Sequence, residues 1–187
     1  MTYKEIGDFL EKPYHFQVNR DGQLLNILLS RTCHTDAVDQ VYLSKDLTIS
    51  QGSSLIKILY TIKNEGNTSV RAIFGIEFNF NLLAGHAEDR YIQIDGQSPS
   101  EPNLASYGIS SGIKSLCLID KSVGLEIGIH THKMADLWRF PIETASNSES
   151  GFEKVYQSSV IFLNWPLNLK SGEILTYNLD CWVKDIA

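Results

Sequence analysis

Apolar and polar residues alternate with a period of two along most of the chain. In residues 54–63 every second side chain from Ile56 to Ile62 is apolar, which is the pattern of a half-buried β-strand. Turn residues fill positions 64–67 and residues 70–80 predict a second strand, so the two form the clearest predicted hairpin. Similar runs predict strands at residues 14–18, 24–30, 47–50, 91–94, 115–119, 123–131, 155–164 and 174–183. Since helical periodicity is almost absent, the pattern predicts an all-β, antiparallel two-sheet sandwich.

The length and composition agree with one folded domain. The chain has 187 residues, 43% of them hydrophobic, and shows no internal repeat or linker-like boundary. All-β units of about 200 residues commonly fold as one domain, so we expect residues 1–187 to form a single β-sandwich domain. The net charge is −6 and Lys and Arg form no run, which argues against nucleic acid or an anionic membrane surface as the main partner. No apolar segment has the length of a membrane span.

Three cysteines, Cys33, Cys117 and Cys181, lie far apart, within or beside apolar runs. They are interpreted as buried, reduced thiols of a cytosolic protein, and one disulfide with a spare thiol is the alternative. No Cys/His spacing indicates zinc. Residues 1–8 lack the apolar core of a signal peptide, so we expect a cytoplasmic location unless a longer parent carries a signal.

Residues 76–81 place polar side chains on one face of a predicted strand. Glu77, Asn79 and Asn81 alternate with Ile76 and the phenylalanines that follow it. A row of carboxylate and amide groups suits hydroxyl-rich ligands such as an oligosaccharide. An ordinary solvated sheet face is the alternative interpretation, and the sequence leaves both open.

Glu126, His130 and His132 fall on one face of another predicted strand. Two imidazoles on one side of a strand are typical of some metal sites, but such a site needs a third and usually a fourth ligand. No such ligand follows at a characteristic spacing, so we predict neither a metal nor another cofactor. Sugar hydrogen bonding through His130, or proton transfer by a His/Glu pair, is a different use. Ordinary surface or core histidines are the remaining alternative.

A dense mixture of aromatic, acidic and amide side chains lies in residues 137–157, which run from a strand end through a small-polar turn into a second strand. Sugars are bound by such a mixture, because flat rings cover C–H faces while carboxylates and amides bond to hydroxyls. Trp138, Glu143 and Tyr156 are therefore candidate carbohydrate-binding residues. Core packing of Trp138, with Glu143 and Glu153 bonded to buried backbone donors, is the alternative. No motif of a known catalytic site occurs, so we predict no catalytic residue.

Several segments together resemble one protein family. They are residues 74–83 (FGIEFNFNLL), 137–144 (LWRFPIET) with 148–153 (SESGFE), 155–158 (VYQS) and 165–173 (WPLNLKSGE). The first residues, around Asp8 and Tyr14, are similar as well. The family is the C-terminal β-sandwich domain of 4-α-glucanotransferases and α-amylases of glycoside hydrolase family 57.

This resemblance implies a supersandwich like that of galactose mutarotase, in which two mostly antiparallel sheets stack face to face. In the family, the domain follows a catalytic (β/α) barrel that carries the nucleophile and the acid/base carboxylates. These 187 residues resemble the sandwich alone, so no position inherits a catalytic role. We expect either a piece cut from a longer enzyme, which the start at the family's domain boundary favours, or a free-standing protein that binds glucans or partners a separate barrel.

Three functions follow as hypotheses. The first is a non-catalytic accessory domain of an α-glucan-processing enzyme, which supports the barrel in cis or in trans and binds α-1,4-glucan. Its candidate carbohydrate-binding residues are Glu77, Asn79, His130, Trp138, Glu143 and Tyr156. The second is a stand-alone sugar enzyme of the mutarotase type, with His130 or His132 and Glu126 or Glu77 as its acid/base pair, and it rests on fold analogy. The third is a purely structural domain whose apolar patch docks against the barrel.

Overall fold

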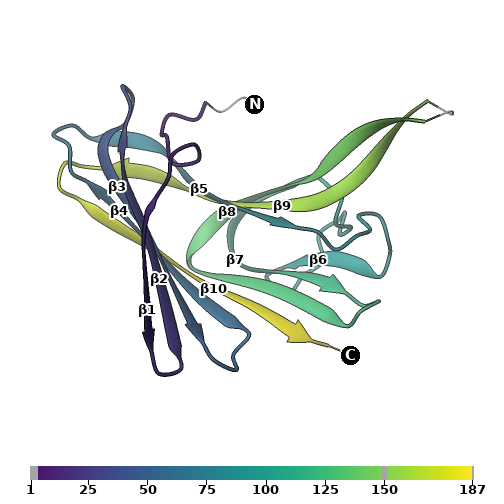
Figure 1. Ribbon diagram of the computed structural model, residues 1–187. Coiled ribbons are helices and arrows are strands. Elements are labelled where there is room, and N and C mark those ends of the chain that lie inside the picture. The colour runs from purple at the N-terminus through teal and green to yellow at the C-terminus, as the bar shows by residue number, and fades with distance from the viewer. Residues whose placement is uncertain (1–3, 149–150, 187) are drawn as a thin grey trace. The chain divides into compact units, whose positions relative to one another are not determined.

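A computed structural model describes residues 4–148 and 151–186 of the chain (Figure 1). Over these ranges the regular elements are β-strands, which confirms the all-β prediction. In chain order they are β1 (His15–Asp21), β2 (Leu24–His34), β3 (Asp39–Ser50), β4 (Leu55–Asn64), β5 (Val70–Phe80), β6 (Arg90–Ile94), β7 (Gly108–Asp120), β8 (Leu125–Ser148), β9 (Gly151–Leu169) and β10 (Ile174–Asp185). Within the described ranges, no helix is long and apolar enough to span a membrane.

The chain divides into two compact units. The first unit comprises Met1–Ile73 and Pro166–Cys181, and the second comprises Phe74–Trp165 and Trp182–Ala187. Three strands, β5, β9 and β10, therefore contribute residues to both units. The expectation that residues 1–187 form a single domain stays a prediction.

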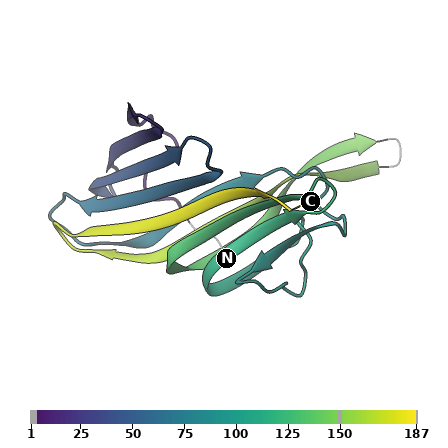
Figure 2. The same ribbon diagram turned by 90° about the horizontal axis from the view of Figure 1, so that it is seen from below.

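In the first unit, β1 to β4 pair in chain order as antiparallel neighbours, and β10 follows β4 (Figure 2). The alternation predicted for residues 54–63 is confirmed, because Ile58 and Ile62 are buried while Leu59 between them is exposed. Other buried apolar residues of this unit include Cys33, Val38, Val41, Leu43, Tyr60, Val70, Leu167, Leu169, Tyr177 and Leu179. One face of the ladder thus supplies the core of the unit.

The predicted hairpin of residues 54–63 and 70–80 is wrong, although both strands exist. β4 pairs with β3 and β10, whereas β5 pairs with β9. The wholly buried side chain of Asn64 explains the difference. Its Nδ2 donates to the carbonyl oxygens of Thr68 (2.7 Å) and Leu169 (3.1 Å), and its Oδ1 accepts from the backbone N–H of Gly66 at 3.0 Å. These bonds bind the turn to the end of β9, so the chain continues beside β9 instead of returning along β4.

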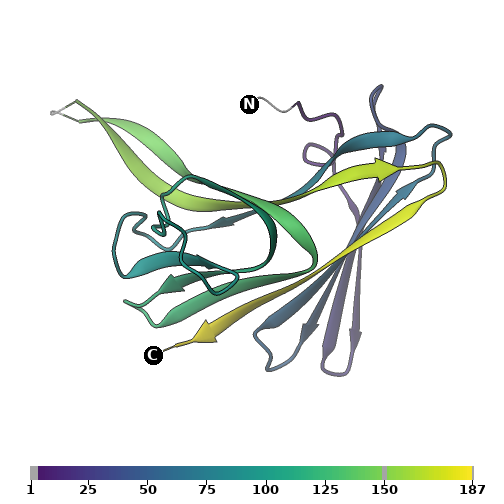
Figure 3. The same ribbon diagram turned by 180° about the vertical axis from the view of Figure 1, so that it is seen from behind.

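In the second unit, β6, β7 and β8 form an antiparallel ladder, β9 pairs with β8, and β5 pairs with β9. The β8–β9 pairing runs from Asp136 opposite Asn164 to Ser148 opposite Gly151, and we call it the β8–β9 ribbon. Near Trp138 the ribbon is flanked by β7, and its outer end extends as two strands alone (Figure 3). The strands predicted at the two ends of residues 137–157 are present, but both are longer than expected, since β8 continues to Ser148 and β9 begins at Gly151. Residues 149–150 of the predicted turn lie outside the described ranges. Buried apolar residues of the unit include Ile76, Ile92, Leu104, Leu116, Leu118, Ile129, Leu137, Ile161 and Leu163.

Candidate functional site

Glu77 and Asn79 lie on the exposed face of β5. The predicted alternation is present, since Ile76 is buried and both polar side chains are exposed. Asn79 Nδ2 donates a hydrogen bond to Glu77 Oε1 at 3.0 Å. The two side chains therefore form a joined amide–carboxylate pair that still has acceptor and donor capacity for hydroxyl groups.

Trp138 belongs to the same face of the second unit. It lies opposite Phe162 in the β8–β9 ladder, and the two rings stack with centroids 5.2 Å apart. Phe162 in turn covers Gly75 on β5, where a Cβ atom would come within 2.1 Å of the ring. Because Gly75, Glu77 and Asn79 alternate along one strand, their positions share one side of the sheet. We call Glu77, Asn79 and Trp138, with Gly75 and Phe162 between them, the Trp138 face.

Glu143 and Tyr156 lie opposite each other in the β8–β9 ribbon but on its other side. Side chains alternate along β8, so Glu143 points away from the side shared by Trp138 and Ile142. Glu143 Oε2 is 3.4 Å from Lys154 Nζ. The Tyr156 hydroxyl shares a 2.7 Å hydrogen bond with Ser159 Oγ and donates to a backbone carbonyl, that of Phe80, at 3.4 Å. The structure therefore does not bring these two candidates together with Trp138.

Arg139, the neighbour of Trp138 in sequence, is buried on the opposite side of β8. Its Nη1 donates to Ser106 Oγ, its Nε has no partner within the described residues, and the guanidinium lines a small cavity with Asn103 and Ser159. Burial lowers the pKa of Arg139, and the charge of Glu101 opposes that shift. Arg139 is thus an interior cation and not part of the Trp138 face.

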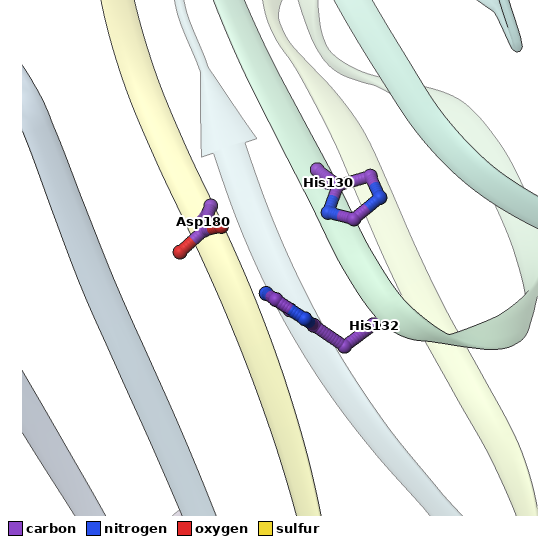
Figure 4. A group of neighbouring side chains, drawn as sticks. All are labelled: His130, His132 and Asp180. Carbon is purple, nitrogen blue, oxygen red and sulfur yellow. The ribbon is translucent and has the colours of Figure 1, made fainter.

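His130 and His132 project from β8, and their ring centroids are 5.1 Å apart in an edge-to-face arrangement (Figure 4). His130 is half-buried and His132 is exposed. His130 lies opposite Ser115 of β7, outside the β8–β9 ribbon that carries Trp138. Asp180, also labelled in Figure 4, lies on the part of β10 that belongs to the first unit. His130 is therefore separate from the other candidate residues.

The sequence did not predict the partner of Glu126, which is Trp182. Trp182 Nε1 donates to Glu126 Oε1 at 2.9 Å, and Lys184 Nζ lies 3.6 Å from the same oxygen. The indole rests on Gly128, where a Cβ atom would come within 2.0 Å of the ring. Gly128, which lies between Glu126 and His130 on one strand face, is the sequence signal that could have indicated this indole-binding position. Since Glu126 is engaged by two donors, the acid/base pair of the mutarotase-type hypothesis gains no support from this geometry.

Cys117 lies next to this cluster, opposite Gly128 in the β7–β8 ladder. Burial, together with the nearby charge of Glu126, raises the pKa of the Cys117 thiol to about 11. The thiol is therefore protonated at neutral pH, and a protonated thiol is neither a good nucleophile nor a metal ligand.

The sequence matches the family described as "Alpha-amylase/4-alpha-glucanotransferase, C-terminal" over residues 1–179. The chain belongs to this family. Its similarity to alpha-amylase 1 of Dictyoglomus thermophilum is 31% identity over 180 residues, which cover 96% of this chain and 25% of the relative. The 4-alpha-glucanotransferase of Thermococcus kodakarensis is 25% identical over 155 residues, or 83% of this chain and 19% of the relative. This family member therefore spans about a quarter or less of the curated relatives that it matches.

Solved structures confirm the fold. The 4-alpha-glucanotransferase of Thermococcus litoralis superposes with a TM-score of 0.65 at 20% identity, over 96% of this chain and 24% of that one. An aldose 1-epimerase homologue from Escherichia coli K12 also gives 0.65, at 13% identity over 91% of this chain and 68% of that one. A galactose mutarotase-like protein from Clostridium acetobutylicum gives 0.56 at 13% identity, with 92% and 66% covered. The family member thus has the galactose mutarotase-like β-sandwich fold, as predicted.

Proposed function

We propose that this chain is the non-catalytic accessory β-sandwich of an α-glucan-processing enzyme, a 4-α-glucanotransferase or α-amylase of the glycoside hydrolase family 57 type. In this role it supports a catalytic barrel, in cis or in trans, and binds α-1,4-glucan. The observation that carries the proposal is the family match over residues 1–179, combined with the quarter of the relatives' length that the chain spans. All three cysteines are free thiols, which is consistent with a protein that functions in the reducing cytoplasm.

The Trp138 face is the surface that supports glucan binding. Glucose rings present apolar C–H faces and rims of hydroxyls, so they bind where an aromatic ring stands beside carboxylate and amide groups. Trp138 supplies the ring and the Glu77–Asn79 pair supplies the polar groups. Phe140 is 36% exposed two residues further along the same side of β8, which extends the apolar part of the face.

Calorimetric titration with maltoheptaose tests this assignment. We expect saturable heat with the wild-type chain and loss of that heat in Trp138→Ala, because the variant removes the aromatic platform. Glu77→Gln is expected to weaken binding less, since an amide replaces only one hydrogen-bonding group of the pair. Phe16→Ala is the matched control, because Phe16 is an exposed aromatic of the first unit and its removal leaves the Trp138 face intact.

Two outcomes would decide against glucan binding at this face. Absence of saturable heat at millimolar maltoheptaose in the wild type would leave only the supporting role toward the barrel. Equal binding by wild type and Trp138→Ala, with unchanged circular dichroism, would place the glucan elsewhere on the chain.

A further inference from the structure

We propose that His130 and His132 form a chelating site for one divalent transition-metal ion. The two residues are separated by one position on β8, and side chains at such positions project from the same side of a strand. A ring nitrogen of one imidazole lies within 4.8 Å of a ring nitrogen of the other. Figure 4 shows both rings projecting from the same strand. The histidine pair lies outside the Trp138 face, to which glucan binding is assigned.

Only a small change in side-chain position is needed for both imidazoles to bind one ion. Nitrogen ligands lie about 2.0–2.1 Å from Zn²⁺, so two imidazoles on one tetrahedral ion have nitrogens roughly 3.4 Å apart. The two ring nitrogens already lie within 4.8 Å of one another, so a combined side-chain shift of at most about 1.4 Å brings both to one ion. His130 is half-buried and lies opposite Ser115 in the β7–β8 ladder, so half of the chelate is preorganised.

The donor set selects the class of metal. Neutral imidazole suits Zn²⁺, Cu²⁺ and Ni²⁺, whereas Ca²⁺ and Mg²⁺ require oxygen ligands. Each imidazole has two ring nitrogens, so one can bind the ion while the other keeps a hydrogen-bond partner, which is the usual arrangement in metal sites. Water can fill the coordination positions that the pair does not supply. A two-imidazole chelate completed by water needs no third protein ligand, unlike the closed site considered from the sequence.

Titration of the untagged, EDTA-treated chain with Ni²⁺ or Zn²⁺ tests the proposal. We expect one ion per chain, and at least tenfold weaker binding in each of the single variants His130→Asn and His132→Asn. His86→Asn is the matched control, because His86 is an exposed histidine outside the strands and its loss should leave binding unchanged. Since His132 is exposed, its variant is expected to keep the wild-type circular dichroism.

Pulsed electron paramagnetic resonance with Cu²⁺ provides a second readout. Modulation from the remote nitrogens of two imidazoles is expected in the wild type and from one imidazole in either single variant. The proposal is overturned if the wild type binds no ion at millimolar metal, if a fully folded His132→Asn binds as tightly as the wild type, or if the spectrum shows a single imidazole. These outcomes are independent of maltoheptaose binding, so the glucan proposal and the metal proposal stand or fall separately.

Discussion

At the residue scale, Asp120 shows how this protein keeps a buried carboxylate charged. Its side chain is 4% exposed, and its Oδ2 accepts a 2.7 Å hydrogen bond from Arg90 Nε. Its Oδ1 accepts from the backbone N–H and the hydroxyl of Ser122, at 2.9 Å and 2.7 Å. Burial by itself would raise the pKa of Asp120, but the hydrogen bonds from Ser122 and Arg90 outweigh it and hold that pKa below its ordinary value.

This pKa shift predicts a dependence of stability on pH. A carboxyl group whose pKa is lower in the folded state adds stability above its unfolded pKa of about 3.9, and this stability is lost as the pH falls through the folded value. Asp120→Asn should therefore lower the free energy of unfolding by about 2 kcal/mol at pH 7, because a neutral amide replaces the carboxylate that accepts from Arg90 and Ser122. It should also make the loss of stability below pH 4 shallower than in the wild type. Urea unfolding between pH 7 and pH 3 measures both effects.

The control for this prediction is Asp21→Asn, because Asp21 is exposed at the end of β1. Its unfolding free energy should follow the wild-type curve across the same pH range. Asp8 also has a lowered pKa, to which its ion pair with Arg31 contributes, so some acid sensitivity should persist in Asp120→Asn. If the unfolding free energies of wild type and Asp120→Asn fell in parallel with decreasing pH, Asp120 would not be a source of the acid sensitivity.

The residue scale also shows how far the candidate site was predictable. Alternation within one strand placed Glu77 and Asn79 on the exposed face of β5, and the structure agrees. The same local rule could not show that Phe162 lies over Gly75 and stacks on Trp138, which puts Trp138 on the same side of the sheet as Glu77 and Asn79, because these contacts join three strands. Nearness in sequence was misleading for Glu143, since a strand turns successive side chains to opposite sides.

At the element scale, the connection from β4 to β5 depends on the side chain of Asn64. The turn residues Asn64-Glu65-Gly66-Asn67 are typical of a hairpin connection, but here the amide of Asn64 bonds to Thr68, Gly66 and Leu169. Ser171 adds a hydroxyl bond to the carbonyl of Gly66 at 2.7 Å. The turn is therefore bonded to the β9–β10 connection, and β5 becomes a neighbour of β9.

Substitution of Asn64 tests this role. Asn64→Ala should lower the free energy of unfolding by about 2–3 kcal/mol, because it leaves buried backbone groups of Leu169 and Gly66 without their partner. Asn67→Ala, in the exposed part of the same turn, should change stability by less than about 0.5 kcal/mol. Chemical denaturation of the two variants measures the difference. Equal unfolding free energies of the two variants would show that the β4–β5 connection does not depend on the buried amide of Asn64.

The strand prediction failed where polar residues interrupt the apolar alternation and a neighbouring strand stabilises them. The run before residue 47 was not predicted as a strand, although β3 begins at Asp39. Ser44 and Lys45 interrupt the apolar alternation there. In the folded chain Ser44 is buried and the Lys45 ammonium lies 5.4 Å from the centre of the Tyr60 ring on β4, where burial lowers the pKa of Lys45. The compensation comes from β4, the next strand in the chain, and the alternation within β3 gives no sign of it.

At the scale of the whole molecule, two compact units share three strands. β5, β9 and β10 each contribute residues to both units, so unfolding of either unit shortens strands that the other contains. We therefore expect a single calorimetric unfolding transition, with equal calorimetric and van't Hoff enthalpies. Scanning calorimetry at two protein concentrations measures this and shows whether association contributes. Two resolved transitions would contradict the prediction of a single domain.

The sequence alone was enough to predict the all-β class, the apolar side of β4 and the polar side of β5. These features follow from the period-two alternation and from turn residues, which act over a few positions. Tertiary contacts were needed to show that β5 pairs with β9, that Trp138 lies on the same side of the sheet as Glu77 and Asn79, and that Trp182 binds Glu126. The physical reason is that alternation specifies the side of a strand to which a residue points. Which strand lies beside it depends on contacts between residues far apart in the chain.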